Sequence, residues 1–372
     1  MARLGDICTF QSGGTPSKTV PAYYQGNIPW ITTVSLTGGR ISNEDAIEYI
    51  TDQAIRESAA KIVPQNSIMV GTRVGVGKVA INTVPMSTSQ DIISLLNIDE
   101  STWNKDFLCK FIAAKSAYLN SQARGATIKG IKIETLASLD LPEITLEEQK
   151  HISRVIDEVL QLVKYRKDQL NELDQLVKSR FIELFGMPGT DVNGWGLTPL
   201  GNTCQINPKK GQDSRLTSGL TVSFVPMPAV SENGNIDPSD TREYDAVKTG
   251  FTYFAEKDVL FAKITPCMEN GKGAVARGLH NGIGFGSTEF HVLRPLPNIS
   301  NPYWIYTLTA FPEFRSDAAN NMTGSAGQRR VPSSFLEQYR VSLPPIELQN
   351  EFAAFVEHTD KLKYCGDLEV AA

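Results

Sequence analysis

Two short segments of the chain combine basic side chains with small residues, a composition suited to binding a phosphate backbone. Residues 123–133 read ARGATIKGIKI, and residues 324–331 read GSAGQRRV. Small residues let a backbone approach phosphates, while hydroxyl, amide and basic side chains reach phosphate oxygens or base edges. An ordinary basic loop is the alternative, but the occurrence of two such segments favours binding to nucleic acid. The predicted contact residues are Arg124, Thr127, Lys129, Gln328, Arg329 and Arg330.

Further basic residues lie in turns that contain glycine. Residues 13–18 read GGTPSK, and residues 209–212 read KKGQ. The remaining candidate contact residues lie on two expected Gly-rich hairpins. These hairpins follow the predicted strands that begin at Ile68 and Val259. Sequence alone leaves open which of these residues read bases and which position a backbone. This second group of predicted contacts comprises Lys18, Arg73, Lys78, Lys209, Lys210, Lys263 and Lys272.

Two other motifs could indicate catalysis or nucleotide binding. Residues 301–304, NPYW, resemble the Asn-Pro-Pro-Tyr motif with which amino-methyltransferases hold a flipped adenine, but the second proline is missing. We predict instead a helix that begins with an Asn cap and a Pro at its first position. Residues 71–78, GTRVGVGK, are one residue too long for a phosphate loop, and Val79 replaces the required Ser or Thr. A turn between two strands is therefore expected there.

The net charge of the 372-residue chain is −5, yet both large parts of the chain are neutral. Residues 1–143 carry 13 basic and 13 acidic side chains, and residues 187–345 carry 14 of each. A neutral domain still binds nucleic acid if its basic residues share one face, because salt screens distant charges. The overall charge therefore permits binding to nucleic acid without indicating it.

Cysteine and histidine usage argues against metal sites and disulfides. The five cysteines are scattered and odd in number, which favours a reducing cytoplasm. The four histidines lack metal-ligand spacing, so no metal site is predicted. The sequence contains neither an apolar run of membrane-spanning length nor a signal-peptide core, so we expect no membrane segment.

The elements that position the basic residues occur twice along the chain. A comparison of the chain with itself shows two copies offset by about 200 residues. Each copy contains short β-branched segments, a helix near its end and a Leu-Pro exit, which predicts a largely antiparallel α+β domain used twice. The expected helices are 105–122 and 302–320, and the expected strands are 28–34, 68–72, 78–83, 92–96, 224–228, 259–264, 273–277 and 289–293. The matched segments are 4–8 with 200–204, 34–35 with 230–231, 67–71 with 259–263, 77–80 with 273–276, and 141–149 with 343–349.

Residues 146–185 lie between the copies and contain no Gly or Pro. A heptad pattern predicts one coiled-coil helix, about 60 Å long, with one apolar seam and a second seam interrupted by Arg166 and Arg180. Thr145 and Glu148 form a predicted capping box, and Gly186 ends the helix. Such a helix either dimerises or separates two domains; a helix buried in one large domain is the alternative. The apolar seam comprises Ile156, Val163, Leu170, Val177 and Leu184.

Several of these segments, taken together, resemble the DNA specificity subunit of type I restriction-modification enzymes. They are LGDI at 4–7, LPEITLEEQ at 141–149 with its weaker echo at 343–349, RFIELFG at 180–186 and GSTEF at 286–290. The resemblance covers nearly the whole chain. It implies two target-recognition domains, residues 1–143 and 187–345, joined by a spacer helix at 144–186 and followed by a C-terminal helix and tail at 346–372.

The resemblance also implies a function without catalysis. Such a subunit reads a bipartite, asymmetric target in double-stranded DNA, with one half-site for each domain. Methyltransferase subunits, which bind S-adenosylmethionine, and an ATP- and Mg-dependent restriction subunit are separate proteins, so no cofactor is expected in this chain. The alternatives are an adenine-type DNA methyltransferase and a coiled-coil adaptor that binds proteins.

The chain departs from the family pattern at its end, because the second helix is expected to span only Leu348–Cys365. It would cover about half of the long helix, and we expect an exposed apolar seam over the rest. A methyltransferase subunit, a second copy of this chain or a half-length homologue could bind that seam. The predicted interface residues are Val163, Leu170, Val177, Leu184, Phe352 and Phe355.

Overall fold

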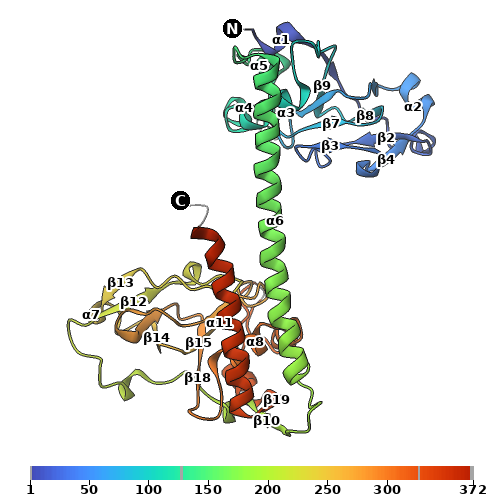
Figure 1. The fold of residues 1–372 in the computed structure, drawn as a ribbon. Coiled ribbons are helices and arrows are strands. Elements are labelled where there is room, and N and C mark those ends of the chain that lie inside the picture. Colours follow the sequence, from blue (N-terminus) through green and yellow to red (C-terminus); the bar gives the residue numbers. More distant parts are fainter. Residues whose placement is uncertain (1, 126–128, 326, 369–372) are drawn as a thin grey trace. The chain divides into compact units, whose positions relative to one another are not determined.

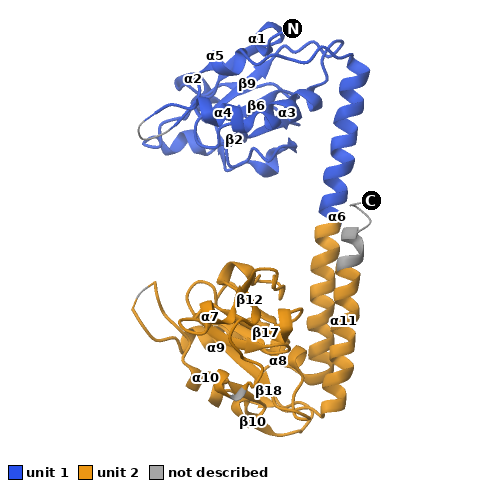
Figure 2. Cartoon of the chain, turned by 90° about the vertical axis from the view of Figure 1, so that its left-hand side faces the viewer, with its two compact units in different colours: residues 1–165 blue, residues 166–372 orange. Residues whose placement is uncertain are grey.

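The computed structural model describes residues 2–125, 129–325 and 327–368. The chain is an α+β protein that divides into two compact units (Figure 2): unit 1 is Met1–Tyr165 and unit 2 is Arg166–Ala372. The long helix α6 (Leu146–Phe185) crosses this boundary, and a shorter helix, α11 (Ile346–Leu368), ends the described chain (Figure 1). Within the described residues, we find no helix that combines the length and apolar character needed to cross a membrane.

Unit 1 contains two sheets, with strand orders β1-β9-β6-β7-β3 and β4-β2-β8-β5. The strands are β1 (Thr9–Ser12), β2 (Ile28–Ile31), β3 (Arg40–Ile41), β4 (Glu48–Ile50), β5 (Ile62–Val63), β6 (Ile68–Gly71), β7 (Val79–Asn82), β8 (Met86–Thr88) and β9 (Ile92–Leu96). The helices are α1 (Leu4–Ile7), η1 (Pro21–Tyr24), η2 (Asn43–Asp45), α2 (Asp52–Glu57), α3 (Lys105–Ala114), α4 (Ser116–Gln122) and α5 (Ile133–Ala137).

Unit 2 repeats this pattern with the orders β11-β18-β15-β16 and β13-β12-β17-β14, and adds the pair β10-β19. Its strands are β10 (Leu197–Pro199), β11 (Cys204–Ile206), β12 (Thr221–Val225), β13 (Thr241–Glu243), β14 (Thr252–Ala255), β15 (Val259–Ala262), β16 (Gly273–Val275), β17 (Ile283–Gly286), β18 (Phe290–Pro295) and β19 (Arg340–Ser342). Its further helices are η3 (Leu200–Asn202), η4 (Lys210–Gln212), η5 (Met227–Ala229), α7 (Tyr244–Val247), η6 (His280–Gly282), α8 (Pro302–Ala310), α9 (Pro312–Asn320) and α10 (Ser333–Gln338).

Eight strands of unit 1 have counterparts in the same order in unit 2; among the described strands, β3 of unit 1 and the pair β10-β19 of unit 2 have none. The central pairs β2·β8 and β12·β17 are both parallel, and the neighbouring strands in each of these smaller sheets are antiparallel. In unit 1, Ile68 and Val70 of β6 pack among the helices, while Met69 faces the second sheet. Val259 and Phe261 of β15 pack likewise, with Leu260 on the other side. The predicted duplication is therefore confirmed.

The register predicted for two matched segments is wrong. The strand ladders equate Ile68 with Val259, because these residues pair with Leu95 and Leu293 in β9 and β18. The predicted match of residue 67 with 259 would move every side chain to the opposite face. The ladders likewise equate Val79 with Gly273, two residues away from the predicted match. Buried strands without polar alternation carry little register information in their sequence.

The predicted terminal helix of each copy is two helices. In unit 2, Phe311 takes an extended ψ of 141° before Pro312, which separates α8 from α9. In unit 1, Lys115 leaves the helical region with ψ near 3°, which separates α3 from α4. The eight predicted strands are present: β9 has the predicted bounds, and the other seven have shorter or shifted ends.

A buried glutamine attaches each long helix to its unit. Gln149, 1% exposed, accepts from the Asn104 amide at 2.9 Å and donates to the carbonyls of Thr102 and Ile144. In unit 2, Gln349 is fully buried and makes the same bonds with the Asn301 amide and the Ile299 and Pro344 carbonyls. The predicted junctions at 141–149 and 343–349 are thus equivalent anchors of α6 and α11.

The predicted caps of α6 are present. Thr145 and Glu148 form the capping box, with bonds of 2.7 and 3.3 Å. The bonds that the Glu148 carboxylate accepts from the amide and the hydroxyl of Thr145 lower the pKa of Glu148. At the other end, Gly186 has a φ of 79°, the left-handed conformation expected of a helix-ending glycine.

Helix α11 packs against the second part of α6 inside unit 2. Phe352 contacts Phe181 and Phe185 with ring centroids 5.5 and 5.4 Å apart, and Arg180 donates to Glu351 at 2.7 Å. The helix continues through Gly366 to Leu368, so its predicted end before that glycine is wrong. Val177, predicted as an interface residue of the exposed seam, instead packs against the core of unit 2.

Candidate nucleic-acid interface

Two loops meet at the same end of the larger sheet in unit 1. The loop at residues 72–78 joins β6 to β7, and the loop at residues 124–130 is closed by backbone pairing of Arg124 with Gly130. The Ile131 amide donates to the Thr72 carbonyl at 2.8 Å, which attaches the second loop to the first. We call residues 72–78 and 124–130 the recognition loops of unit 1; residues 126–128, including Thr127, lie outside the described part of the chain.

Unit 2 has the same arrangement. Its recognition loops are residues 263–272, between β15 and β16, and residues 323–330, closed by backbone pairing of Thr323 with Arg330. The Val331 amide donates to the Lys263 carbonyl at 2.9 Å, as Ile131 does to Thr72. The structure therefore places the two basic segments singled out in the sequence at equivalent positions of two equivalent domains.

Basic side chains gather around a hollow between the recognition loops of unit 1. Arg73, Arg124 and Lys132 line it, together with Gln122 and Thr135. Lys132 belongs to the predicted basic segment but was not among the predicted contacts. Among the predicted contacts, the exposed ones are Lys18, Arg73, Lys78, Arg124, Lys129, Lys209, Gln328 and Arg329.

Other predicted contacts are engaged within the protein. Arg330 donates to both carboxylate oxygens of Glu289, at 2.9 and 2.8 Å, and this pair lowers the pKa of Glu289. Lys263 is half-buried beside the same pair, and burial lowers its pKa. Lys272 donates to the Met227 carbonyl at 3.3 Å. These residues shape the recognition loops of unit 2, whereas Gln328 and Arg329 stay exposed.

Three predicted contacts lie beside the smaller sheets, outside the recognition loops. Lys18 pairs with Glu48 of β4 at 3.4 Å. Lys210 donates to the Lys248 carbonyl, just before β14, and Lys209 precedes it in the chain. The structure thus groups the predicted basic residues into the recognition loops and a flanking set.

Two acidic residues at the recognition loops, Asp91 and Glu289, were not among the predicted site residues. Asp91 and Glu289 occupy equivalent positions, because their carbonyls accept from the Thr72 and Lys263 amides, both at 2.8–2.9 Å. Asp91 lies 3.8 Å from Arg73, a longer contact than that between Glu289 and Arg330. An available signal was the GSTEF segment, which contains Glu289.

Both motifs that suggested catalysis have structural roles. The Asn301 side chain accepts from the Tyr303 amide at 2.9 Å and caps α8, as predicted, and Trp304 is buried in the core. Residues 71–78 form the predicted turn between β6 and β7.

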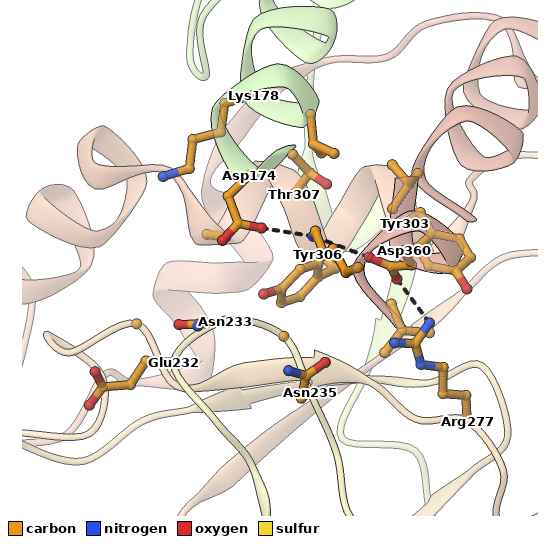
Figure 3. A pocket seen from close by; sticks show the side chains of 17 residues that line it. Asp174, Lys178, Glu232, Asn233, Asn235, Arg277, Tyr303, Tyr306, Thr307 and Asp360 are labelled. Carbon is orange, nitrogen blue, oxygen red and sulfur yellow. Dashed lines mark hydrogen bonds and ion pairs between the residues drawn. The ribbon is translucent and has the colours of Figure 1, made fainter. Parts of the chain in front are cut away.

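A pocket of about 190 Å³ in unit 2 lies between α6, α8, α11 and the turn around Gly234 (Figure 3). Its charged groups form a ladder: Asp174 pairs with Lys363 at 2.7 Å, Lys363 with Asp360 at 3.2 Å, and Asp360 with Arg277 at 3.0 Å. These pairs join both helices to the chain that follows β16. The ladder therefore stabilises the packing of α6 and α11 on unit 2.

The chain is similar to known specificity proteins. The family model for the type I restriction modification DNA specificity domain matches residues 1–175 and 194–364, one stretch for each copy. The specificity subunit of the type I restriction enzyme EcoAI from Escherichia coli is 38% identical over 180 residues, which is 48% of this chain and 29% of that protein. The EcoEI specificity subunit, also from Escherichia coli, is 39% identical over 179 residues, 47% of this chain and 29% of the relative. The match thus spans less than a third of the length of either relative.

Solved structures share the fold. The crystal structure of a type I restriction-modification S subunit from M. genitalium aligns with a TM-score of 0.53 at 13% identity, over 99% of this chain and 91% of the other. Since the family model covers both copies and most of the chain, the protein belongs to the type I restriction modification DNA specificity family.

Proposed function

We propose that this chain is the non-catalytic DNA specificity subunit of a type I restriction-modification enzyme in the cytoplasm. One observation supports this most: the same pair of basic recognition loops occurs at the same place in both units. The side chains differ between the loops, with Arg73, Arg124 and Lys129 in one unit and Gln328 and Arg329 in the other. Each unit would therefore read its own half-site of a bipartite, asymmetric target.

Methylation and ATP-dependent cleavage belong, in this proposal, to partner subunits that bring S-adenosylmethionine, ATP and Mg. The methyltransferase alternative is not favoured, because the one motif that suggested it caps α8. Binding of S-adenosylmethionine by the isolated chain would revive that alternative.

The first part of α6 offers a surface for such a partner. Gln149 and Gln349 are equivalent, so residues 152, 156 and 159 of α6 correspond to residues 352, 356 and 359 of α11. Ile152, Ile156 and Val159 are 37, 36 and 52% exposed, whereas their counterparts in α11 are 0, 6 and 2% exposed, and Phe352 packs on Phe181 and Phe185 of α6. The same helix face is therefore covered in unit 2 and exposed in unit 1.

We infer that the exposed seam of α6, residues 152, 156, 159 and 163, binds a helix of another protein molecule. A methyltransferase subunit, a second copy of this chain and a half-length homologue remain the three candidates. Exposed apolar stripes of this kind mark interaction surfaces.

Binding to duplex DNA tests the main proposal. The chain, mixed with its methyltransferase subunit, should bind DNA with an affinity that falls steeply as salt rises, because basic residues displace counterions from phosphates. Arg329→Ala should weaken specific binding by about tenfold or more. The control is Arg340→Ala, since Arg340 lies on β19, away from the recognition loops. Salt-independent binding, or equal effects of both variants, would contradict the proposal and favour the adaptor.

A further inference from the structure

Arg315 of α9 is a buried arginine that binds backbone carbonyls. Its side chain is 6% exposed, and its Nε donates to the Thr309 carbonyl at 2.6 Å. Its terminal nitrogens donate to the carbonyls of Met268 at 2.9 Å, Gly271 at 3.3 Å and Lys272 at 3.4 Å. Among the described residues, no carboxylate pairs with it.

Burial of a charge is costly unless hydrogen bonds replace its hydration. Burial lowers the pKa of Arg315 to about 10, so the guanidinium stays charged at neutral pH. The ring of Phe261, whose centroid lies 4.5 Å away, adds a favourable contact for the cation. A leucine or methionine would fill this space without the free-energy cost of burying a charge. The presence of arginine therefore indicates that the loop carbonyls require hydrogen-bond donors.

Met268, Gly271 and Lys272 all belong to the recognition loop at residues 263–272, so Arg315 attaches this loop to α9. The loop in turn supports the other recognition loop of unit 2. The Thr265 amide donates to the Arg329 carbonyl at 3.0 Å, and Glu269 lies 4.0 Å from the Arg329 guanidinium. A continuous set of contacts therefore leads from Arg315 to an exposed residue of the candidate interface.

The corresponding helix of unit 1 supports its own recognition loop with a neutral side chain. Asn120 of α4 donates to the Val76 carbonyl at 2.9 Å. The loop at residues 72–78 is shorter than the loop at residues 263–272. The side-chain amide of Asn120 bonds to one carbonyl of this shorter loop. The longer loop of unit 2 presents three carbonyls, which a guanidinium with its fork of donors satisfies.

We propose that Arg315 is a positioning residue for recognition of the second half-site: it fixes the loop at residues 263–272 and, through it, Arg329, without touching DNA. This inference rests on the proposed function. It predicts that Arg315 controls selectivity for bases read by unit 2 and leaves the half-site of unit 1 unchanged.

The test is the methylated motif in cells that express the full chain with its methyltransferase subunit. Arg315→Met removes the donors at similar length, and Arg315→Lys keeps the charge with fewer donors. The measured quantity is the methylation of sites mismatched in the second half-site, relative to intact sites. Arg315→Met should raise this ratio at least tenfold over that of the unaltered chain, and Arg315→Lys should raise it to an intermediate value. Asn120→Leu is the matched variant and should relax only the first half-site.

Two results would overturn the inference. One is a lower melting temperature of Arg315→Lys with unchanged selectivity for the second half-site. If Arg315→Met does not fold, the selectivity of Arg315→Lys alone tests the inference. The other is relaxation of both half-sites by Arg315→Met alone. Absence of any bipartite motif with the unaltered chain would instead refute the proposed function, and the inference with it.

Discussion

At the scale of single residues, Gln149 and Gln349 do the same work in the two units. Each places one side-chain amide against three backbone groups that belong to a helix cap and to the junction before a long helix. Neither glutamine is charged or catalytic, so its place in the sequence motif reflects attachment of α6 and α11. Both junctions were recognisable in the sequence, but the anchoring role of the two glutamines is visible only from their buried hydrogen bonds.

Replacement of Gln149 by leucine should destabilise unit 1 by about 2–3 kcal/mol, because buried backbone groups lose their partners. Calorimetry of the full chain measures this as a lower transition temperature for unit 1, and Gln349→Leu should act on unit 2 in the same way. The control is Gln161→Leu on the exposed side of α6, which should have little effect. Equal effects of Gln149→Leu and Gln161→Leu would show that the anchor is unimportant.

At the scale of elements, strands and helices were predictable where local pattern determines them. The cap at Thr145, the end at Gly186 and the Asn cap of α8 follow from short-range hydrogen bonding, which the sequence displays. The alignment of β6 with its counterpart β15 in the other unit was not predictable, because the residues of both strands are buried on both faces. Nor was the pairing of Arg330 with Glu289, which are 41 residues apart and meet only through the fold.

The exposed seam of α6 yields a prediction at this scale. Val159→Asp combined with Val163→Asp should abolish association with the partner while both units remain folded, since both side chains are about half exposed in the structure. Sedimentation with the methyltransferase subunit, and of the chain alone, measures this association. The control is Leu162→Asp, because Leu162 and its counterpart Leu362 are 65 and 48% exposed and lie off the seam. Unchanged association of the double variant would show that the seam is no interface.

At the scale of the whole molecule, one domain design is used twice with different side chains on its recognition loops. Under the proposed function, two such domains on a single chain suit a target with two separated parts. Between Asp157, which binds Lys110, and Arg166, which binds the Lys363 carbonyl, every residue of α6 is exposed. This stretch is where the length of the helix can change without disturbing either core.

Duplication of residues 159–165 should therefore lengthen the spacer between the half-sites. One heptad adds about 10 Å of helix, which corresponds to about three base pairs of DNA. The methylated motif of the insertion variant should keep both half-sites and gain spacer length. An unchanged spacer would show that α6 does not set the distance.

Methylome sequencing of a host that expresses this chain with its methyltransferase subunit tests the central claim most directly. The account predicts one new methylated motif with two different half-sites and a fixed, unspecified spacer. This motif should be absent when the chain is omitted and the methyltransferase subunit is kept. A continuous motif, or the same methylation without this chain, would contradict the claim that its two units read DNA.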